Sequence, residues 1–384
     1  MSAITPGKDI VNGYEVRRCC VSVILPTYKE SKNLEEMAAR IFRALDDPDL
    51  EGECIVVDDD SRDGTETVCG ELAGRYNLRL IVRKGERGLS TAVLRGLREA
   101  RGDVLVVMDA DLSHPPEKIR EMVRLVREGA DFVLGSRYVE GGSIEENWGL
   151  YRKLNSRVAT GLACLLTNLK DPMSGFFCIS RSTWESCRDL SPLGYKIALE
   201  IVVKSAAKRI AEVPIFFSRR KFGESKMNLK EQLLYLLHLA RLYRYRYPGG
   251  TELLSFLLVG CSGFAIDTFF YFLLQYLFGL SHLIARAASF FVAATWNWYW
   301  NRIVTFLQAG APQFVFQWAR FIAASTVGFF FNWGTYYLLT AHVAYFDVHR
   351  YLALLVGVIV GTASNFTLSK YIVFRRATAS VTSA

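Results

Sequence analysis

Two acidic side chains one residue apart, Asp109 and Asp111, directly follow the apolar run from Val104 to Met108. In an extended segment, the side chains at positions i and i+2 share a face and lie roughly 6–7 Å apart. Two carboxylates held this close repel each other unless a cation lies beside them. Hard oxygen ligands with room for phosphate oxygens favour Mg²⁺ or Mn²⁺. This pair therefore indicates a divalent-cation site that also receives a diphosphate.

A plainer interpretation of the same stretch is a solvated turn in which Ser113 caps a helix that begins at Pro115 and Pro116. A lone pair of aspartates does not decide between the two. The chain has no glycine-rich loop ending in Gly-Lys-Ser or Gly-Lys-Thr, and no Gly-x-Gly-x-x-Gly follows its first expected strand. This argues against P-loop and dinucleotide-binding chemistry.

The elements that must position these carboxylates alternate along the chain. Short β-branched or apolar runs predict strands, and apolar residues at helical spacing predict helices between them. The expected strands are 21–28, 54–61, 78–84 and 104–111, and the expected helices are 33–45, 64–76 and 90–100. This alternation predicts an α/β fold with a mostly parallel sheet covered on both faces. Such sheets bind ligands at the carboxyl ends of their strands, where the acidic residues lie.

Composition narrows the class of protein. The chain has 384 residues, a formal charge of +8 and 51% apolar residues, and long apolar runs are confined to its last third. A basic balance suits phosphorylated substrates or anionic lipid, and nucleic acid is not expected, because no basic tract or zinc-finger pattern is present. The eight cysteines form no C-x-x-C pair and are expected to be reduced thiols. The first 18 residues are polar, so we expect the N-terminus to stay in the cytosol.

Seven motifs in order then carry a family resemblance. They are VSVILPTYKESKNL, VVDDDSRDGT, GLSTAVLRG, VMDADLSHPPE, LGSRYVEGG, DPMSGFF and FGESKMN, spread over roughly residues 20–230. Together they resemble the dolichol-phosphate mannose synthase group of family 2 glycosyltransferases, which have the GT-A fold, a Rossmann-like and mostly parallel sheet. The resemblance implies a catalytic domain at 19–227 that transfers mannose from GDP-mannose to dolichyl or polyprenyl phosphate. It implies Mg²⁺ or Mn²⁺ as cofactor and no obligate protein partner.

The resemblance also implies roles for individual residues. Metal ligands would be Asp109, Asp111 and Ser113. Catalytic residues would be Asp111, Arg137, Arg152 and Arg220. The nucleotide sugar would be bound by Pro26, Tyr28, Glu30, Val57, Asp59, Asp109, Ala110, Asp111, Arg137, Lys196, Arg220 and Lys226.

The chemistry expected of such a site is consistent with these residue types. A phosphate monoester has a second pKa of about 6, so a lipid phosphate is already ionised at neutral pH. It therefore needs no general base to attack the anomeric carbon. The site must instead compensate the charge of the phosphates and stabilise the leaving nucleoside diphosphate. We expect an inverting single displacement.

The remainder of the chain is predicted to meet a membrane. Residues 154–169 and 228–247 are amphipathic, so segment 228–250 is interpreted as an interface helix and linker. Four apolar stretches within 251–376 approach the length needed to cross a bilayer, at 253–279, 283–306, 321–344 and 351–374. The distribution of Arg and Lys predicts that the catalytic domain and both termini, with polar tails at 1–18 and 377–384, are cytoplasmic.

These apolar stretches repeat. Gly263 and Asp267 recur 65 residues later as Gly328 and Asn332, and Asn297 recurs 68 residues later as Asn365. The repeat resembles the GtrA-like four-helix domain. Polar residues within spans are costly in lipid and are expected to face the bundle interior. There they could join helices or could contact a lipid phosphate or lipid-linked sugar.

Two other functions stay open at this point. One is a polyprenyl-phosphate glucosyltransferase that uses UDP-glucose. The details of the motifs DADLSHPP, DPMSGFF and GESK favour mannose, but sugar choice depends on the pocket. A transporter of lipid-linked sugars with a sensor domain would explain the polar residues in the spans. Intact Asp109, Asp111 and Arg137 argue against a catalytically dead soluble half.

Overall fold

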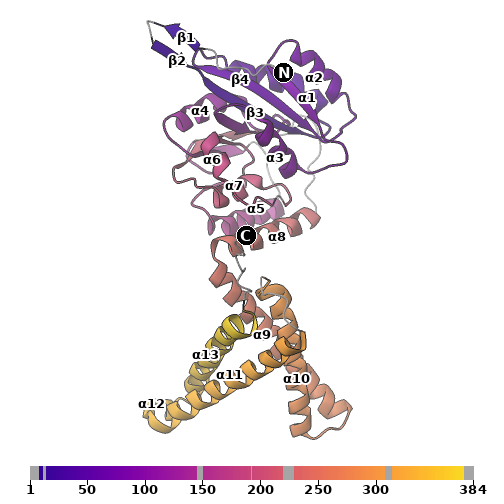
Figure 1. Ribbon diagram of the computed structural model, residues 1–384, viewed down its shortest axis with the longest axis vertical. Helices are drawn as coiled ribbons and strands as arrows, with labels where there is room; N and C mark the ends of the chain where they lie inside the picture. Colours follow the sequence, from indigo (N-terminus) through magenta and orange to yellow (C-terminus); the bar gives the residue numbers. More distant parts are fainter. Residues whose placement is uncertain are drawn as a thin grey trace, which may run out of the picture. The chain divides into compact units, whose positions relative to one another are not determined.

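The computed structural model describes residues 8–11, 14–144, 150–191, 193–218, 229–307 and 314–375, with side chains outside 8–17, 150–156 and 229. The chain divides into two compact units, Met1–Arg246 and Tyr247–Ala384, which are treated separately below (Figure 1). The domain boundaries inferred from the sequence, including a separate interface segment at 228–250, stay predictions.

The first unit is built on a seven-stranded sheet with strand order β10-β7-β9-β6-β3-β4-β5. Neighbouring strands are parallel except that β9 runs antiparallel to both β6 and β7. The strands are β3 (Cys19–Thr27), β4 (Leu50–Asp58), β5 (Leu78–Val82), β6 (Val104–Val107), β7 (Phe132–Ser136), β9 (Phe177–Ser180) and β10 (Ile210–Pro214). The mostly parallel α/β core predicted from the alternating pattern is confirmed. The antiparallel strands β1 (Lys8–Val11) and β2 (Tyr14–Arg17) form a separate two-stranded sheet.

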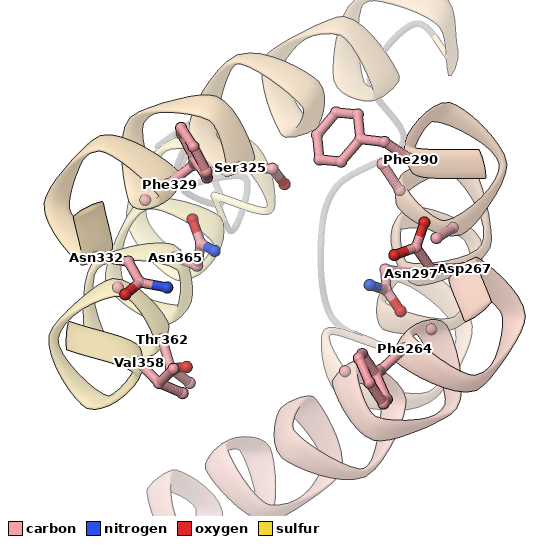
Figure 2. Close-up of a pocket in the computed structure, with 16 residues that line it drawn as sticks. Phe264, Asp267, Phe290, Asn297, Ser325, Phe329, Asn332, Val358, Thr362 and Asn365 are labelled. Atoms are coloured by element: carbon pink, nitrogen blue, oxygen red, sulfur yellow. The ribbon is translucent and has the colours of Figure 1, made fainter. Parts of the chain in front are cut away.

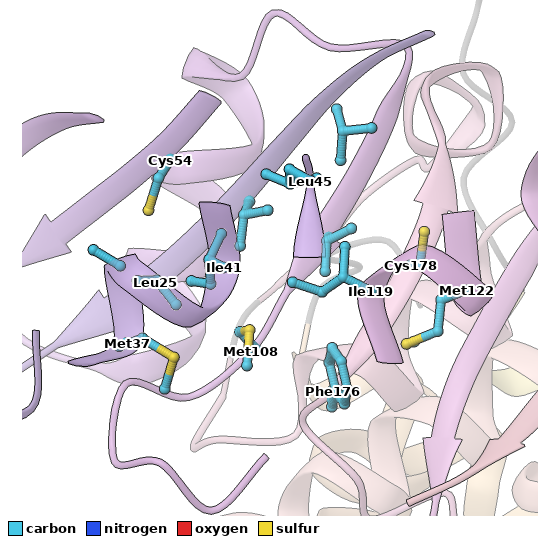
Figure 3. Packing of buried hydrophobic residues seen from close by; sticks show 14 of the residues in the cluster. Leu25, Met37, Ile41, Leu45, Cys54, Met108, Ile119, Met122, Phe176 and Cys178 are labelled. Carbon is cyan, nitrogen blue, oxygen red and sulfur yellow. The ribbon is translucent and has the colours of Figure 1, made fainter. Parts of the chain in front are cut away.

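Helices cover both faces of this sheet. They are α1 (Ser31–Ala44), α2 (Thr65–Ala73), α3 (Leu89–Glu99), α4 (Ile119–Arg127), α6 (Arg181–Ser186) and α7 (Ile197–Lys204). One apolar core joins α1, α2 and α4 to the sheet, as Met37, Ile41 and Met122 illustrate (Figure 3). A second core joins α3 and α7 to the opposite face. The rigid layers fix where the strand ends lie, and so where the acidic loops begin.

The strand that precedes Asp109 is shorter than predicted. We expected it to extend over 104–111, but β6 ends at Val107, and its register with β3 ends where Val107 faces Ile24. Leu112 takes a positive φ of 62°, which an extended strand does not allow. Asp109 and Asp111 therefore lie in a loop. The predicted strand end at 111 was wrong, and the prediction that the two carboxylates hold a cation together stays a prediction.

Two helices of the first unit pack against each other and leave apolar side chains exposed. They are α5 (Leu150–Cys164) and α8 (Leu229–Arg246). The Tyr235 and Tyr243 hydroxyls of α8 donate to the Ala159 and Leu162 carbonyls of α5 at 2.7 and 2.6 Å. The exposed residues are Val158, Leu162, Leu165, Leu233, Leu236 and Leu237. Each helix thus combines packing within the domain with an exposed apolar surface.

The second unit consists of two helical hairpins. One contains α9 (Pro248–Phe272), which continues in the π-helical turn η2 (Leu273–Leu277), and α10 (His282–Trp300), which continues in η3 (Asn301–Thr305). The other contains α11 (Phe314–His342), the short α12 (Ala344–Val348) and α13 (Arg350–Leu368), which continues in η4 (Ser369–Val373). Among the described residues, three helices are long and apolar enough to cross a membrane: Pro248–Leu277, Phe314–His342 and Arg350–Val373. The fourth predicted span, at α10, stays a prediction.

The sequence repeat corresponds to a repeated contact. A Cβ added at Gly263 would overlap the side-chain amide of Asn297, and one added at Gly328 would overlap that of Asn365. Each hairpin thus places an asparagine directly on a glycine backbone, and the two pairs line opposite walls of one cavity of about 310 Å³ (Figure 2). This close approach explains why both positions of the repeat are glycines.

The two hairpins are also joined by reciprocal polar bridges. Arg302 in η3 donates to the Gln317 side chain of α11 at 2.6 Å, and the Lys370 ammonium in η4 lies 2.7 Å from the Glu252 carboxylate of α9. Gln317 and Glu252 occupy equivalent repeat positions, 65 residues apart. Each hairpin therefore supplies the cation that meets the first helix of the other.

Candidate active site

The carboxyl ends of β3, β4, β6 and β7 meet at one edge of the sheet, where the antiparallel β9 begins. The acidic loop that follows β6 is held there by its own hydrogen bonds. The Ser113 hydroxyl and backbone N–H donate to one carboxylate oxygen of Asp111 at 2.5 and 3.1 Å. The Asp109 backbone N–H donates to Nδ1 of His114 at 3.2 Å.

His114 supports this loop rather than serving as a base. Its ring packs between Phe176 and Phe217, with centroid distances of 5.4 Å to each. Burial lowers the pKa of His114 below its ordinary value, although the nearby Asp109 and Asp111 carboxylates oppose this. A neutral ring whose Nδ1 accepts from Asp109 N–H is an orienting group for the loop.

Arg137, directly after β7, forms a buried ion pair with Asp171. The guanidinium donates through Nε and a terminal nitrogen to both carboxylate oxygens at 2.7 Å, and the Arg137 backbone N–H donates at 3.0 Å. The Asp171 side chain is 0% exposed and that of Arg137 is 10% exposed. Although burial disfavours its charge, the Asp171 carboxylate raises the pKa of Arg137 above its ordinary value. A two-point pair of this kind fixes the orientation of the cation.

A second cation joins the same cluster. The Lys196 ammonium donates to the Met173 carbonyl at 2.5 Å, in the loop that Asp171 opens. Burial, together with the nearby Arg137 charge, lowers the pKa of Lys196 to about 8. In the same loop a Cβ at Gly175 would lie 3.6 Å from an Asp109 carboxylate oxygen. The loop after β6, the end of β7, the 171–177 loop and the start of α7 thus converge on one site.

A second group of predicted residues lies at the ends of β3 and β4. The Arg83 guanidinium donates to one carboxylate oxygen of Asp59 through Nε, at 2.8 Å, and through a terminal nitrogen, and the Gly88 backbone N–H donates to the other at 2.8 Å. This buried pair closes the turn between β5 and α3 over the end of β4. Asp59 thus joins the end of β4 to Arg83 and Gly88 at this edge of the sheet.

The other predicted nucleotide contacts differ in exposure. The Arg87 guanidinium carbon lies 4.9 Å from the centroid of the Tyr28 ring, so the two side chains form a cationic and aromatic surface. Glu30 occupies the N-cap position of α1, and its carboxylate accepts from the Asn33 side-chain amide at 2.7 Å. The side chains of Pro26, Val57 and Ala110 are buried, so these three could reach a ligand through backbone atoms only.

Three predicted site residues are not placed. The Arg152 side chain, in the first turn of α5, and the whole of Arg220 and Lys226 lie outside the described residues. Ser218, the last described residue before that segment, donates its backbone N–H to the Ser113 carbonyl at 3.1 Å. The described part of the chain before Arg220 therefore ends next to the acidic loop.

The sequence argument missed Asp171 and Arg83 as site residues. Both pair with a predicted residue far along the chain, Asp171 with Arg137 and Arg83 with Asp59. The available signal was the position of Asp171 at the start of the motif DPMSGFF. Its partner could not be identified without the fold.

The donor set suits a small hard cation. Mg²⁺ is usually held by one or two carboxylates, with water and substrate phosphate oxygens filling the other positions. Among the described residues, no group of three or more His, Cys, Asp or Glu forms a closed metal cage. Two carboxylates with a hydroxyl beside them, Asp109 and Asp111 with Ser113, fit a cation that shares its shell with a diphosphate.

Comparisons with known proteins agree with this geometry. The family model "Glycosyl transferase family 2" matches residues 22–186, and "GtrA/DPMS, transmembrane domain" matches residues 255–374. The dolichol-phosphate mannosyltransferase of Pyrococcus furiosus is 38% identical over 357 residues, covering 92% of this chain and 98% of that protein. The enzyme of the same name from Saccharomyces cerevisiae is 42% identical over 246 residues, covering 62% of this chain and 91% of that one.

Among solved structures, mannosyl-3-phosphoglycerate synthase from Rubrobacter xylanophilus is 21% identical, with a TM-score of 0.47, covering 59% of this chain and 75% of that one. The match to a transmembrane domain, together with the three long apolar helices, makes the chain an integral membrane protein.

Proposed function

The chain belongs to the dolichol-phosphate mannosyltransferase family of glycosyltransferases, and from this premise we propose that it transfers mannose from GDP-mannose to dolichyl or another polyprenyl phosphate. The observation that carries the proposal is the convergence of Asp109, Asp111, Arg137 and Lys196 at one edge of the sheet, with Asp171 orienting Arg137. Anionic and cationic groups side by side suit a reaction in which a lipid phosphate approaches a metal-bound diphosphate.

Asp109 and Asp111, with Ser113 beside them, would hold Mg²⁺ or Mn²⁺. When bound, this cation would neutralise charge on the diphosphate of the donor and of the departing GDP. Asp111 is prepared for this role, because the Ser113 hydroxyl and N–H already orient one of its oxygens. Asp109 is prepared by the bond from its backbone N–H to His114.

The remaining steps depend on cations of the chain itself. Arg137 presents a fixed guanidinium to a phosphate group, and Lys196 adds a second positive charge. Arg152, Arg220 and Lys226 complete the set in this proposal. The ionised lipid phosphate attacks the anomeric carbon directly, with inversion and no general base. The Nδ1 atom of His114 already accepts from the Asp109 backbone N–H, so it is occupied in supporting the loop.

Tyr28, Glu30 and Asp59, together with backbone atoms of Pro26, Val57 and Ala110, would bind the nucleoside. The aromatic and cationic surface of Tyr28 and Arg87 supports this assignment, because bases stack on aromatic rings and guanidinium planes. Asp59, held by Arg83 and Gly88, would be a fixed acceptor for donors of the base or ribose.

The membrane arrangement in this proposal has four spans, with α10 as the fourth, and places the catalytic unit on the cytoplasmic side. Its support is the distribution of cations. Arg302, Arg320, Lys370 and Arg375 lie at one end of the apolar helices, and Arg286 and Arg350 lie at the other. The exposed leucines of α5 and α8 would rest in the headgroup layer, where a lipid phosphate is presented.

The proposal is tested with purified full-length protein, polyprenyl phosphate and Mg²⁺ or Mn²⁺. GDP-mannose and UDP-glucose are offered in parallel, and lipid-extractable label is counted. Label from GDP-mannose alone supports the proposal. Label from UDP-glucose alone keeps the reaction type and contradicts the donor, and no label from either contradicts transferase activity toward this lipid.

The lowered pKa of Lys196 predicts a pH effect. Free enzyme should lose the Lys196 charge as pH rises through about 8, and the affinity for phosphates should fall with it. We expect kcat/KM for GDP-mannose to fall about fivefold between pH 8 and pH 9, because this ratio reports free-enzyme pKa values. Lys196→Arg keeps its charge in this range and should show a flat profile. A wild-type profile that stays flat to pH 9, or a variant that falls equally, would contradict the assignment.

A further inference from the structure

The chain that leads into Lys196 is held by a buried carboxylate of the helix that follows it. Glu200 lies in the first turn of α7 and is 1% exposed. Its Oε1 atom accepts from the Ser191 backbone N–H at 2.8 Å and from the Lys204 ammonium at 2.7 Å. The same ammonium donates to the Asp189 carbonyl at 2.7 Å. Asp189 and Ser191 are thus tied to α7, and Lys196, at the N-cap of α7, stands where the chain enters this helix.

Helix α8 packs against the same junction. The Arg241 guanidinium of α8 donates to the Ser191 hydroxyl at 3.3 Å, and a Cβ added at Gly194 would lie 3.7 Å from Cβ of Leu234. One apolar cluster joins α7 to α8 through Leu199, Val203, Tyr235, Leu239 and Leu242. The helix whose exposed leucines we place in the headgroup layer therefore also supports the segment that carries Lys196.

Two buried polar atoms at this junction have no hydrogen-bond partner among the described residues, namely Oε2 of Glu200 and Nε2 of His238 in α8. His238 is 2% exposed. Burial lowers the pKa of His238, and the nearby Glu200 carboxylate and Lys196 backbone oppose this. The neutral ring thus lies close to both. Stability alone does not explain a carboxylate buried with one oxygen unbonded, because such an oxygen costs free energy.

We propose that Glu200 is a positioning residue, which holds the Lys196 ammonium at the donor site by fixing the chain that carries it, with α8 as the other half of this support. The inference rests on the proposed function, because it takes Lys196 as a contact of the donor phosphates. The Lys196 ammonium donates to the Met173 carbonyl and lies 4.6 Å from the centroid of the Tyr195 ring. A small shift at the start of α7 would therefore move it out of place.

The sign of a pKa change separates positioning from a direct effect of charge. Burial is the main reason that the pKa of Lys196 is lowered to about 8; among the described residues, Arg137 lowers it further, and Asp171 and Asp109 raise it. If Glu200 acted through its charge, its removal would lower this pKa, because a carboxylate favours the charged form of lysine. If Glu200 positions Lys196, its removal lets the ammonium reach water, and the pKa rises toward its ordinary value.

The test measures the titration of Lys196 itself in the full-length protein in lipid nanodiscs, without nucleotide and with a chelator. An amine-acylating reagent is applied at a series of pH values, and the labelled fraction of Lys196 is counted by peptide mass spectrometry. The first variant is Glu200→Gln. The double variant Glu200→Gln, Lys204→Met leaves no buried ammonium unpaired, so it serves if the single variant does not fold. His238→Ala opens the α8 side of the junction without a change of charge.

Glu53→Gln is the matched control. The Glu53 carboxylate is also buried, at 9% exposed, and accepts from the Ser22 hydroxyl at 2.6 Å and from the Arg101 backbone N–H at 2.7 Å. It lies toward the amino ends of β3 and β4, away from the edge that carries the site. This variant should lose stability as the Glu200 variants do, and leave Lys196 as it is.

We expect a labelling midpoint near pH 8 in wild type and in Glu53→Gln. The midpoint should rise by about one pH unit or more in the Glu200 variants, and by less in His238→Ala, since lost burial restores the charged form. A midpoint that stays or falls in the folded Glu200 variants, or rises equally in Glu53→Gln, would overturn the proposal. An unmoved midpoint in His238→Ala would remove α8 from it. Labelling needs no turnover, so a failure of mannosyl transfer, assayed separately, is visible on its own.

Discussion

Asp111→Asn is expected to lower mannosyl transfer by about 10³-fold while leaving the protein folded and in the membrane. The substitution removes a charge that the proposed metal needs, and the loss of such electrostatic stabilisation has this order of magnitude. The fold should survive, because an asparagine oxygen can still accept from the Ser113 hydroxyl and N–H. The measurement is initial rate against Mg²⁺ and Mn²⁺ concentration, with thermal unfolding in parallel.

The matched control for this variant is Asp103→Asn. Asp103 is an exposed aspartate that directly precedes β6, so it lies at the opposite end of the strand that leads to Asp109 and Asp111. It should show wild-type rates and metal dependence. Turnover near the wild-type rate in folded Asp111→Asn would remove this residue from the proposed metal site.

Asp171→Asn is expected to have the second largest effect, on both stability and rate. It leaves the Arg137 guanidinium buried without its carboxylate partner, and breaking a buried pair costs about 3–5 kcal/mol. A misplaced guanidinium should lower kcat about 10²-fold, as small displacements of a catalytic group do. Asp171 acts through Arg137, so it is a positioning residue. Chemical denaturation and steady-state kinetics below the unfolding transition measure the two effects separately.

Two further variants separate positioning from folding. Arg40 and Glu117 also form a two-point pair, at 2.8 Å through each nitrogen, but their side chains are 27% and 58% exposed. Glu117→Gln should therefore cost under about 1 kcal/mol and leave kcat unchanged. The double variant Arg137→Met, Asp171→Leu should recover much of the lost stability without recovering activity. Full activity in that double variant would show that the pair has only a structural role.

The sequence was sufficient for the α/β core because its signals are local. Each strand is a short apolar run next to a helix with apolar residues at regular spacing, and these patterns survive in β3, α1, β4 and α3. The acidic loop was placed at the correct edge for the same reason. Its conformation was not predicted, because the end of β6 depends on pairing with β3, and the turn at Leu112 leaves no clear trace in the residue type.

Contacts between residues far apart in the chain could not be predicted from the sequence, for a different reason. Arg137 and Asp171 are 34 residues apart, and each reads as an ordinary surface charge until β7 and the 171–177 loop are brought together. The repeat in the membrane unit was visible from residue types alone. That Asn297 rests on Gly263, and that both hairpins face one cavity, required the helices to be packed.

The reciprocal bridges between the hairpins bear on the order in which the membrane unit is completed during synthesis. Glu252, near the beginning of this unit, is met by Lys370, almost at its end. Arg302 likewise meets Gln317 only after the second hairpin has started to emerge. The pair of Asp267 and Arg286 forms within the first hairpin. Glu252 of the same hairpin, in contrast, meets Lys370 only after nearly the entire chain has been synthesised. A nascent protein stopped before Lys370 therefore lacks the bridge between Glu252 and Lys370, so its two hairpins are not yet joined at this point.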